Sequence, residues 1–580
     1  MIVSAPDRLL RVDLTTRTTT SERVPEPWLR KYIGGKGLGA RYLYEELEPG
    51  TDPLGPENAL LFMLGPLTGL VPGDARYAAV TKSPLTGTFL DSYAGGEFPA
   101  VLAGALDEHI GLLIEGAASE PVRIDVEAGK ASVASTDNWG TDTVETAKGY
   151  DGSVACIGPA GENRVAYATI ASDAGEHHAG RGGAGAVMGA KRLKAVVARG
   201  DPPSGLETLR ERYERRFETD SATSWHRTSG TVETIEFADA VGALAGEGWQ
   251  TRGVEDAGAL GIEAIRERAT DRERPNEASP GDFRVETESG EHVPRGGTAI
   301  SLGAGLGIDE FDAVVELGAR CDELGLDLID AGSAVAWTIH ASERGIVDRK
   351  IEFGDPDGAR ELLEEIVLRE TPLGDALADG VDAAAEGFGG DELVPTVKAM
   401  ALPGYDPRGA PSMALAYATS DRGACHRRAL PIEREVFAAD WTPERVAREV
   451  AVEQDRRSVL WSLVIDEFVA PVFDDLGAEW LEAVGVAPDT DLRTVGERIW
   501  TLTRLFNVRE GFGRTDDVLP QPLAGQEGVD RDSFEAMLDH YYEYRGWGAS
   551  GQPTPALVDR LEMSDIDQTD RLSDSLDTDE

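Results

Sequence analysis

Cysteine is scarce in this chain. Among 580 residues there are only three, Cys156, Cys321 and Cys425, and no two of them form a CxxC pair. A disulfide framework needs a larger set of cysteines, and a thiolate metal site needs closely spaced ones. The sequence therefore indicates neither a disulfide-stapled fold nor a metal bound by thiolates.

Long apolar runs and excess positive charge are also missing. No run of about 18 uncharged apolar residues occurs, and the start MIVSAPDRLLRVDL has no apolar signal segment. With 105 acidic against 56 basic side chains the net charge is −49, and a field of this sign repels nucleic acid and anionic lipid. We expect a cytoplasmic protein that binds neither nucleic acid nor membrane.

The acidity itself carries a hypothesis about the source. Only nine of the basic residues are lysine, and the acidic residues are spread along the whole chain. Such a surface suits a protein that stays soluble in concentrated salt, so we infer a halophilic source. The hydrophobic content of 41% is enough for globular cores, and the length predicts two to four domains.

What the chain does have is glycine, most densely at residues 179–191, AGRGGAGAVMGAK. Backbone so bare lets N–H groups approach a ligand, and the second half is typical of a helix start, where free N–H groups favour an anion such as phosphate. Arg181 lies inside the run. The alternative is a tight loop between packed elements, since neither the GxGxxG nor the GxxxxGK[ST] pattern is present.

Further glycine-rich loops occur between residues 30 and 190, and Arg76 and Lys82 lie in or near them. One of these loops is Tyr93-Ala94-Gly95-Gly96. Several loops that pair bare backbone with cations favour a cradle for a large, multiply phosphorylated ligand.

The distribution of strand-like and helix-prone segments along the chain predicts an α+β multidomain fold. Residues 8–24, 59–96 and 110–135 contain short strand-like runs, whereas the chain beyond residue 203 is mainly helix-prone. We expect a β-rich domain over residues 1–203 and two mostly helical domains over 204–402 and 403–555. Residues 556–580 are expected to be an acidic, disordered tail.

Longer motifs resemble the aldehyde ferredoxin oxidoreductase family of tungsten- or molybdenum-pterin enzymes. The resemblance spans about residues 30–430 and is carried by YIGGKGLGARYLYEELEPGTDPLGPENALLF, GPLTG, RYAAVTKSPLTG, VACIGPAGEN, GRGGAGAVMGAKRLKAV, GLDLIDAGSAVAW and GYDPRG followed by ALAYATSDRGACHRRA. It implies an N-terminal base of two β-sheets carrying two molybdopterin-type cofactors on one metal, two helical domains that close over it, and a homodimer.

The resemblance also implies which residues bind the cofactor. The phosphates and a Mg²⁺ ion between them would lie at Arg76, the loop Tyr93-Ala94-Gly95-Gly96 and Arg181-Gly182-Gly183. The Mg²⁺ would take the backbone carbonyls of Tyr93 and Gly182, and no side chain would bind a metal directly. In the family, two DxxGL signatures hold the pterin edges; here they give Asp322 and Asp327 in DELGLD, and Asp466 in the degenerate DEFVAP.

One family cofactor lacks its ligands. Members of the family hold a [4Fe–4S] cluster with a CxxCxxxC triplet and the cysteine of the second signature, because the cluster needs four thiolates. The corresponding segment here, RERPNEASPGDFRVETESGEHV at residues 272–293, has no cysteine. We therefore do not expect the cluster, and we interpret Cys321 and Cys425 as small buried hydrophobic side chains.

The sequence around the expected active site also differs from the family pattern. The resemblance places a glutamate where this chain has Gly297, whereas His426 and Tyr405 remain at positions expected near the metal. Three functions stay open. The first is aldehyde oxidation to the carboxylic acid with ferredoxin as acceptor; the second is a pterin-metal oxidoreductase with another acceptor or a partner subunit. The third is a non-catalytic cofactor-binding or structural protein.

Overall fold

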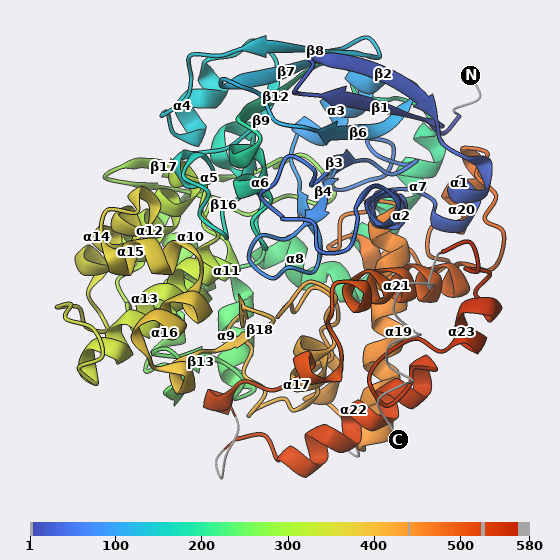
Figure 1. Ribbon diagram of the computed structural model, residues 1–580. Coiled ribbons are helices and arrows are strands. Elements are labelled where there is room, and N and C mark those ends of the chain that lie inside the picture. Colours follow the sequence, from blue (N-terminus) through green and yellow to red (C-terminus); the bar gives the residue numbers. More distant parts are fainter. Residues whose placement is uncertain (1–3, 439–440, 524–527, 567–580) are drawn as a thin grey trace.

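The N-terminal part of the protein is built on two six-stranded sheets. The computed structural model describes residues 4–438, 441–523 and 528–566. The first sheet has the order β2-β1-β6-β3-β4-β5 and the second β11-β10-β9-β12-β7-β8. In Figure 1 both occupy the upper part of the molecule, in blue to teal. They confirm the predicted two-sheet, α+β architecture.

The strands follow the apolar runs of the sequence. The inner strands β3 and β4 are buried throughout because they are covered on both faces, whereas β7 alternates buried and half-buried positions. The strands of the first sheet are β1 (Arg8–Asp13), β2 (Thr18–Arg23), β3 (Leu60–Met63), β4 (Tyr77–Lys82), β5 (Phe89–Ala94) and β6 (His109–Glu115). Those of the second are β7 (Val122–Glu127), β8 (Lys130–Ser135), β9 (Ser153–Cys156), β10 (Ile170–Ser172), β11 (His177–Ala179) and β12 (Leu193–Arg199).

One hydrophobic core lies between the sheets, and helix α3 (Phe98–Leu106) packs into it against β6 and β12. The other face of the first sheet carries α2 (Gly35–Glu46), whose glycines allow close packing. A Cβ on Gly39 would lie 2.7 Å from Val80, and one on Gly35 would lie 2.2 Å from the Trp461 carbonyl oxygen. The remaining helices of this part are α1 (Glu26–Tyr32), α4 (Thr143–Lys148), α5 (Pro159–Glu162) and α6 (Ala184–Ala190).

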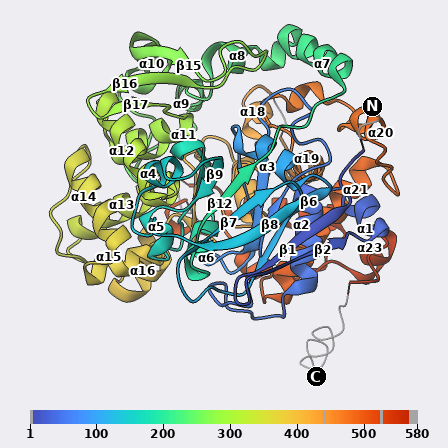
Figure 2. The ribbon, with the colours of Figure 1, turned by 90° about the horizontal axis from the view of Figure 1, so that it is seen from above.

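The second part is mainly helical, and most of it packs in a core that also takes residues from its neighbours. Most of it appears in green and yellow on the left of Figure 1, whereas α7 lies on the right there and beside the orange α20 in Figure 2, in the core of the third part. Its helices are α7 (Glu207–Thr219), α8 (Ser224–Ser229), α9 (Glu233–Ala240), α10 (Ile262–Arg268), α11 (Gly296–Thr298), α12 (Phe311–Leu324), α13 (Leu328–Glu343), α14 (Pro356–Leu368), α15 (Pro372–Ala378) and α16 (Val381–Phe388). Its short strands are β13 (Ala245–Gly246), β14 (Thr251–Arg252), β15 (Ala269–Arg272), β16 (Phe283–Thr287), β17 (Gly290–His292), β18 (Thr396–Val397) and β19 (Met400–Ala401).

The third part packs on the first sheet. Its long helices α19 (Pro443–Ser462), α21 (Leu492–Arg509) and α22 (Arg531–Arg545) contact one another, and α19 and α21 also contact α2, so this part shares a core with the N-terminal part. Helix α17 (Ser412–Ala418) contributes to both helical cores. The shorter helices are α18 (Ile432–Glu435), α20 (Ala478–Ala483) and α23 (Pro555–Arg560).

The predicted disordered tail begins too early. Residues 555–566 form α23 and the turn after it, and their apolar side chains, such as Leu557 and Leu561, are buried. These sparse apolar residues are spaced so that one face of a short helix meets the third part. Residues 567–580 lie outside the described residues. Within the described part of the chain, no helix combines the length and apolar character that crossing a membrane requires.

Candidate functional site

The glycine-rich loop enters α6 through two left-handed residues, Gly182 and Gly183, with φ of 84° and 85°. A Cβ on Gly183 would lie 2.0 Å from the Ala166 carbonyl oxygen, and one on Gly182 would lie 2.5 Å from Leu90. The Gly182 carbonyl oxygen accepts a hydrogen bond of 2.7 Å from Ser83 Oγ. These two glycines therefore serve close packing, as the alternative interpretation of the loop predicts.

The first family signature, DELGLD, forms the turn between α12 and α13. Gly325 ends α12 in the left-handed conformation, and Asp327 caps α13 by accepting from the N–H groups of Ile329 and Asp330. The turn is tied to the N-terminal part because the Asp327 N–H donates to the Tyr167 carbonyl oxygen at 3.1 Å. The signature thus positions an aspartate at a helix start that faces the sheets.

Arg181 meets this turn from the N-terminal part. Its Nε lies 3.0 Å from Asp327 Oδ2, its Nη2 lies 3.2 Å from Asp330 Oδ2, and Nη2 also donates to the Ala401 carbonyl oxygen at 2.6 Å. Sequence reasoning brought Arg181 and Asp327 to one site but missed Asp330. Burial raises the pKa of Asp330 well above its usual range. Its position one helical turn beyond the signature aspartate was the available signal.

Asp322, the other aspartate of the signature, lies elsewhere. Its Oδ1 is 3.2 Å from His178 Nε2, and its side chain is 39% exposed. Partial burial raises the pKa of Asp322 above its usual range.

The second signature aspartate, Asp466, pairs with Arg76 at 2.9 Å. Asp466 also accepts from the N–H groups of Asp74 and Phe468, both at 3.2 Å. Burial opposes its ionisation, but Arg76 and His226 outweigh that effect and keep the pKa of Asp466 below its usual range. The glycine and cysteine missing from this signature do not prevent Asp466 from meeting Arg76.

The loop after β5 packs against acidic side chains. Tyr93 donates to Asp91 Oδ2 at 2.6 Å, and the buried Ala94 ends the strand. A Cβ on Gly95 would lie 2.6 Å from Asp74 Oδ2, and one on Gly96, where φ is 89°, would lie 1.8 Å from Asp173 Oδ2. Only glycine fits at these two positions.

Cys425 is buried, as predicted, but it lies among arginines, so its surroundings are not those of a hydrophobic side chain. Arg422 Nη2 donates to Cys425 Sγ at 3.1 Å. Burial opposes ionisation of the thiol, but the surrounding guanidinium groups, Arg422 foremost, outweigh it and lower the pKa of Cys425 to about 7. Cys321 is also buried, and there burial outweighs the effect of Arg320 and raises the pKa, as expected for a small hydrophobic side chain.

His426 and Tyr405 are brought together, with ring centroids 5.4 Å apart. Burial first, and then the positive charge of Arg427 and Arg181, hold the pKa of His426 well below its usual range. Burial raises the pKa of Tyr405 to about 12. At neutral pH the imidazole is therefore uncharged and the phenol keeps its proton.

Several charged groups around this centre were missed by sequence reasoning. The buried Lys36 pairs with Asp91 and Asp421, and Arg428 pairs with the same two carboxylates. Arg422 donates to the Asp91 carbonyl oxygen at 2.5 Å. The signal was available, because these residues stand in the motifs GGKG and DRGACHRR.

The four arginines Arg76, Arg181, Arg422 and Arg428, together with His426, form what we call the arginine seat. Each contributes a buried nitrogen without a hydrogen-bond partner among the described residues: Arg76 Nε, Arg181 Nη1, Arg422 Nε, Arg428 Nη1 and His426 Nδ1. An unsatisfied buried polar group costs about 1–3 kcal/mol, and more when it is charged. The seat therefore fits an anionic group rich in acceptor atoms, such as a phosphorylated pterin.

A second charged region occupies the segment where the resemblance would place the iron–sulfur ligands. Arg295 Nη1 lies 2.6 Å from Glu273 Oε2 and 3.0 Å from Asp282 Oδ2, and its Nη2 lies 3.0 Å from Glu273 Oε1. Burial opposes ionisation of Glu273, but Arg295 and His177 outweigh it and keep its pKa well below the usual range. We call Asp74, His177, Glu273, Arg274, Asp282 and Arg295 the ion-pair network.

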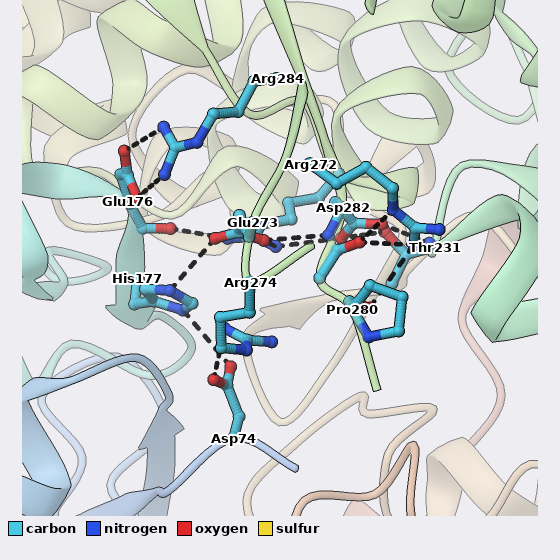
Figure 3. A network of polar contacts seen from close by, with 12 residues as sticks. Asp74, Glu176, His177, Thr231, Arg272, Glu273, Arg274, Pro280, Asp282 and Arg284 are labelled. Atoms are coloured by element: carbon cyan, nitrogen blue, oxygen red, sulfur yellow. Dashed lines mark hydrogen bonds and ion pairs between the residues drawn. The ribbon is translucent and has the colours of Figure 1, made fainter. Parts of the chain in front are cut away.

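Figure 3 shows how the network joins two parts of the chain. His177, on β11, lies with Nε2 3.3 Å from Glu273 and Nδ1 4.0 Å from Asp74, and Asp74 pairs with Arg274 at 2.6 Å. The nearby Glu176 pairs with Arg284 at 2.7 Å. Ligand atoms of Glu176, His177 and Glu273 lie within 4.8 Å of one another. Each of these carboxylates already holds an arginine, so the group is charge-balanced and favours no cation.

The donor set also does not fit a [4Fe–4S] cluster. Segment 272–293 holds no cysteine, and the chain has three in all, one fewer than the four thiolates required. Carboxylates of this segment, among them Glu273 and Asp282, are instead bound by guanidinium groups.

Comparison with known proteins agrees with the motifs. The family profile for the N-terminal domain of aldehyde ferredoxin oxidoreductase matches residues 9–200, and the profile for its domains 2 and 3 matches residues 208–563. The chain belongs to the aldehyde ferredoxin oxidoreductase family.

Curated relatives within this family match over nearly their whole length. The tungsten-containing aldehyde ferredoxin oxidoreductase of Pyrococcus abyssi is 33% identical, with 94% of this chain and 96% of that protein covered. The Pyrococcus furiosus protein of the same name is 32% identical, with 96% and 99% covered. The WOR-like subunit of an aliphatic sulfonate oxidoreductase from P. furiosus is 28% identical, with 96% of each covered.

A solved structure shares the aldehyde ferredoxin oxidoreductase fold of this chain. It is the active-site complex BamBC of benzoyl coenzyme A reductase with 1,5-dienoyl-CoA, with a TM-score of 0.82, 22% identity and 98% of each chain covered. At this identity the likeness shows the fold alone.

Proposed function

We propose that this family member oxidises aldehydes to carboxylic acids at a tungsten bis-pterin centre held by the arginine seat. The observation that supports it is the set of unpartnered buried N–H groups in the seat, in a chain whose relatives are named tungsten-containing aldehyde ferredoxin oxidoreductases. When bound, such a centre supplies a two-electron acceptor and a site for oxygen transfer. The overall reaction takes aldehyde and water to the carboxylic acid, two protons and two electrons.

Two arginine–aspartate pairs would hold the cofactor. Arg181 and Asp327 would hold one pterin, and Arg76 and Asp466 the other, with the loops at Tyr93–Gly96 and Gly182–Gly183 shaping the floor. We keep Mg²⁺, at the carbonyl groups of Tyr93 and Gly182, as part of the proposal; the Gly182 oxygen already accepts from Ser83 and has one lone pair left. Asp322, the other aspartate of the first signature, would hold a polar edge of a pterin.

His426 and Tyr405 would orient the aldehyde. A neutral imidazole with an unpartnered Nδ1 and a protonated phenol can each hydrogen-bond the substrate oxygen, and neither carries a charge that would attract bulk water. Because Gly297 stands where the resemblance places a glutamate, no carboxylate at that position takes the proton of the attacking water. His426, with its low pKa, is a weak base, so its main contribution is hydrogen bonding.

The electron acceptor is the part of the proposal that departs from the relatives' name. The ion-pair network fills the segment expected to bind the cluster, which favours an acceptor or a partner subunit that approaches the pterin directly over electron transfer through a cluster to ferredoxin. The halophilic source, the cytoplasmic location and the homodimer also remain proposals, which salt-dependent unfolding, fractionation of the source cells and light scattering would test.

Metal analysis and a dye assay test the proposal. Protein made in its native host should contain stoichiometric tungsten, or molybdenum in its place, with far less iron than the four atoms of a [4Fe–4S] cluster. It should reduce a viologen dye in the presence of aldehyde. Metal-replete protein that reduces no dye with any aldehyde would favour the non-catalytic alternative, and cluster-level iron would contradict the ligand count.

A further inference from the structure

A small pocket lies beside the candidate site, within the second part of the chain. Its volume is about 40 Å³, and it lies between one face of α13, the π-helical turn η4 (Ala299–Gly303) and the chain at residues 402–404. The α13 residues lining it include Ile329, Ser333, Trp337 and His340, at the spacing of one helix face. π-helical turns are rare and occur frequently at functional sites.

Several residues that line the pocket are close in sequence to residues of the candidate site. Ile329 follows Asp327 by two residues, and Asp327 pairs with Arg181. Gly404 directly precedes Tyr405, and Leu402 follows Ala401, whose carbonyl oxygen accepts from Arg181. Two of the segments that form the pocket, the start of α13 and residues 401–405, therefore also supply the candidate site.

One side of the pocket is lined by a histidine that hydrogen bonds hold in place. His340 lies with Nε2 3.1 Å from the Gly248 carbonyl oxygen and Nδ1 2.6 Å from Gln250 Nε2, so both ring nitrogens are engaged. Hydrogen bonds therefore fix the orientation of the His340 ring that lines this side of the pocket.

The lining is apolar except for two hydrogen-bonding groups. Trp337 is 1% exposed, and its Nε1–H has no acceptor among the described residues; the buried Ser333 Oγ has no partner there either. No lysine or arginine lines the pocket. Buried groups of this kind are normally hydrogen-bonded, so the pocket has the polarity of a site for a neutral molecule that brings an acceptor atom.

The geometry points to a substrate subsite: this pocket binds the side chain of the aldehyde, and Trp337 and Ser333 select a short, uncharged chain that ends in a hydroxyl or ether oxygen. The inference rests on the proposed aldehyde oxidation and deepens it. Because a water molecule needs about 10–15 Å³ of such volume, the pocket has room for roughly three heavy atoms beyond the aldehyde carbon. An ionised chain is disfavoured because no cation lines the pocket.

The test compares two aldehydes of equal length, 3-hydroxypropanal and butanal, in the metal-replete protein with a viologen dye. Trp337→Phe removes the N–H and keeps an aromatic ring, so kcat/KM for 3-hydroxypropanal should fall about tenfold relative to that for butanal, mainly through KM. Ser333→Ala should lower the same ratio about threefold. Trp480→Phe is the matched control, because Trp480 Nε1 is equally buried and unpartnered but lines no part of this pocket.

The outcomes separate the subsite from the proposed function. An unchanged ratio in both Trp337→Phe and Ser333→Ala, or octanal turned over as well as butanal, overturns the subsite while aldehyde oxidation stands. If wild-type protein oxidises no aldehyde, the proposed function fails, and the subsite is tested by soaking crystals with 1,3-propanediol. Density for the diol within hydrogen-bond distance of Trp337 Nε1 supports the subsite, and density for water alone overturns it.

Discussion

The arginine seat and the ion-pair network are both rich in buried charge, but they are completed in different ways. In the network each carboxylate is paired within the chain, as Glu273 and Asp282 are with Arg295. In the seat four arginines keep nitrogens without partners among the described residues. The carboxylates of the network are satisfied as folded, although Arg274 Nε also lacks a hydrogen-bond partner among the described residues, whereas the seat gathers four arginines that each keep such a nitrogen and therefore fits an anionic ligand.

The difference follows from the cost of burying charge. A buried ion pair is tolerated when each charge has a partner with good geometry, and removing one partner leaves the other uncompensated. An unpartnered buried donor is tolerated when a ligand supplies the missing acceptor. A segment that binds a cofactor can therefore do without it when arginine and carboxylate side chains replace the ligands and pair with one another. Segment 272–295 contains such arginine and carboxylate side chains.

The largest expected effect is at the centre of the network. Arg295→Met leaves Glu273 and Asp282 buried without their cation, so it should lower the free energy of unfolding by about 3–5 kcal/mol. Denaturant unfolding of the full chain at constant salt measures it. A loss below 1 kcal/mol would show that the network does not behave as a buried ion-pair system.

The next largest effect is expected at the arginine seat and concerns cofactor binding. Arg181→Gln should lower tungsten content at least tenfold, because the cofactor phosphates lose a charged donor worth about 1.5–3 kcal/mol. Metal analysis of protein from the native host measures it, with the melting temperature as a check on folding and Arg76→Gln as a second variant. Arg284→Gln is the control, and full tungsten in both seat variants would mean that the seat does not hold the cofactor.

A pH effect follows from Cys425, whose thiol accepts a hydrogen bond from Arg422 of the seat. Its pKa of about 7 lies below that of an unfolded thiol, about 8.5, so the thiolate is stabilised only in the folded state. That stability is present above pH 8.5 and is lost as the pH falls towards 7. The difference in unfolding free energy between wild type and Cys425→Ser should therefore grow by about 1.5 kcal/mol from pH 6.5 to 8.5. Cys321→Ser, at a thiol whose pKa burial raises, should show a flat difference over this range.

The smallest effect is at the rim of the network. Arg284 pairs with Glu176 and Glu291, but both partners are more than one-third exposed. Arg284→Gln should therefore change the free energy of unfolding by less than about 1 kcal/mol. A loss as large as that of Arg295→Met would erase the distinction between the centre and the rim, and the same unfolding experiment decides it.

Sequence reasoning predicted the elements better than their contacts. The strands of the N-terminal part follow from short apolar runs, and their arrangement in two sheets follows from the family resemblance. The pairing of Arg76 with Asp466 joins residues 390 positions apart, and no local pattern encodes it. The early start of the predicted tail was wrong because a few spaced apolar residues in α23 have a partner surface that only the folded chain provides.

Taken by itself, the sequence determined the family, the two-sheet base, the positions of the glycine loops and the absence of thiolates for a cluster, since these depend on residue type and order. Only the tertiary structure decided that Cys425 lies among arginines, that the cluster segment closes on itself as ion pairs, and which glycines serve packing. Those properties depend on the distances between side chains remote in sequence, and Coulomb and hydrogen-bond energies are set by distance and burial.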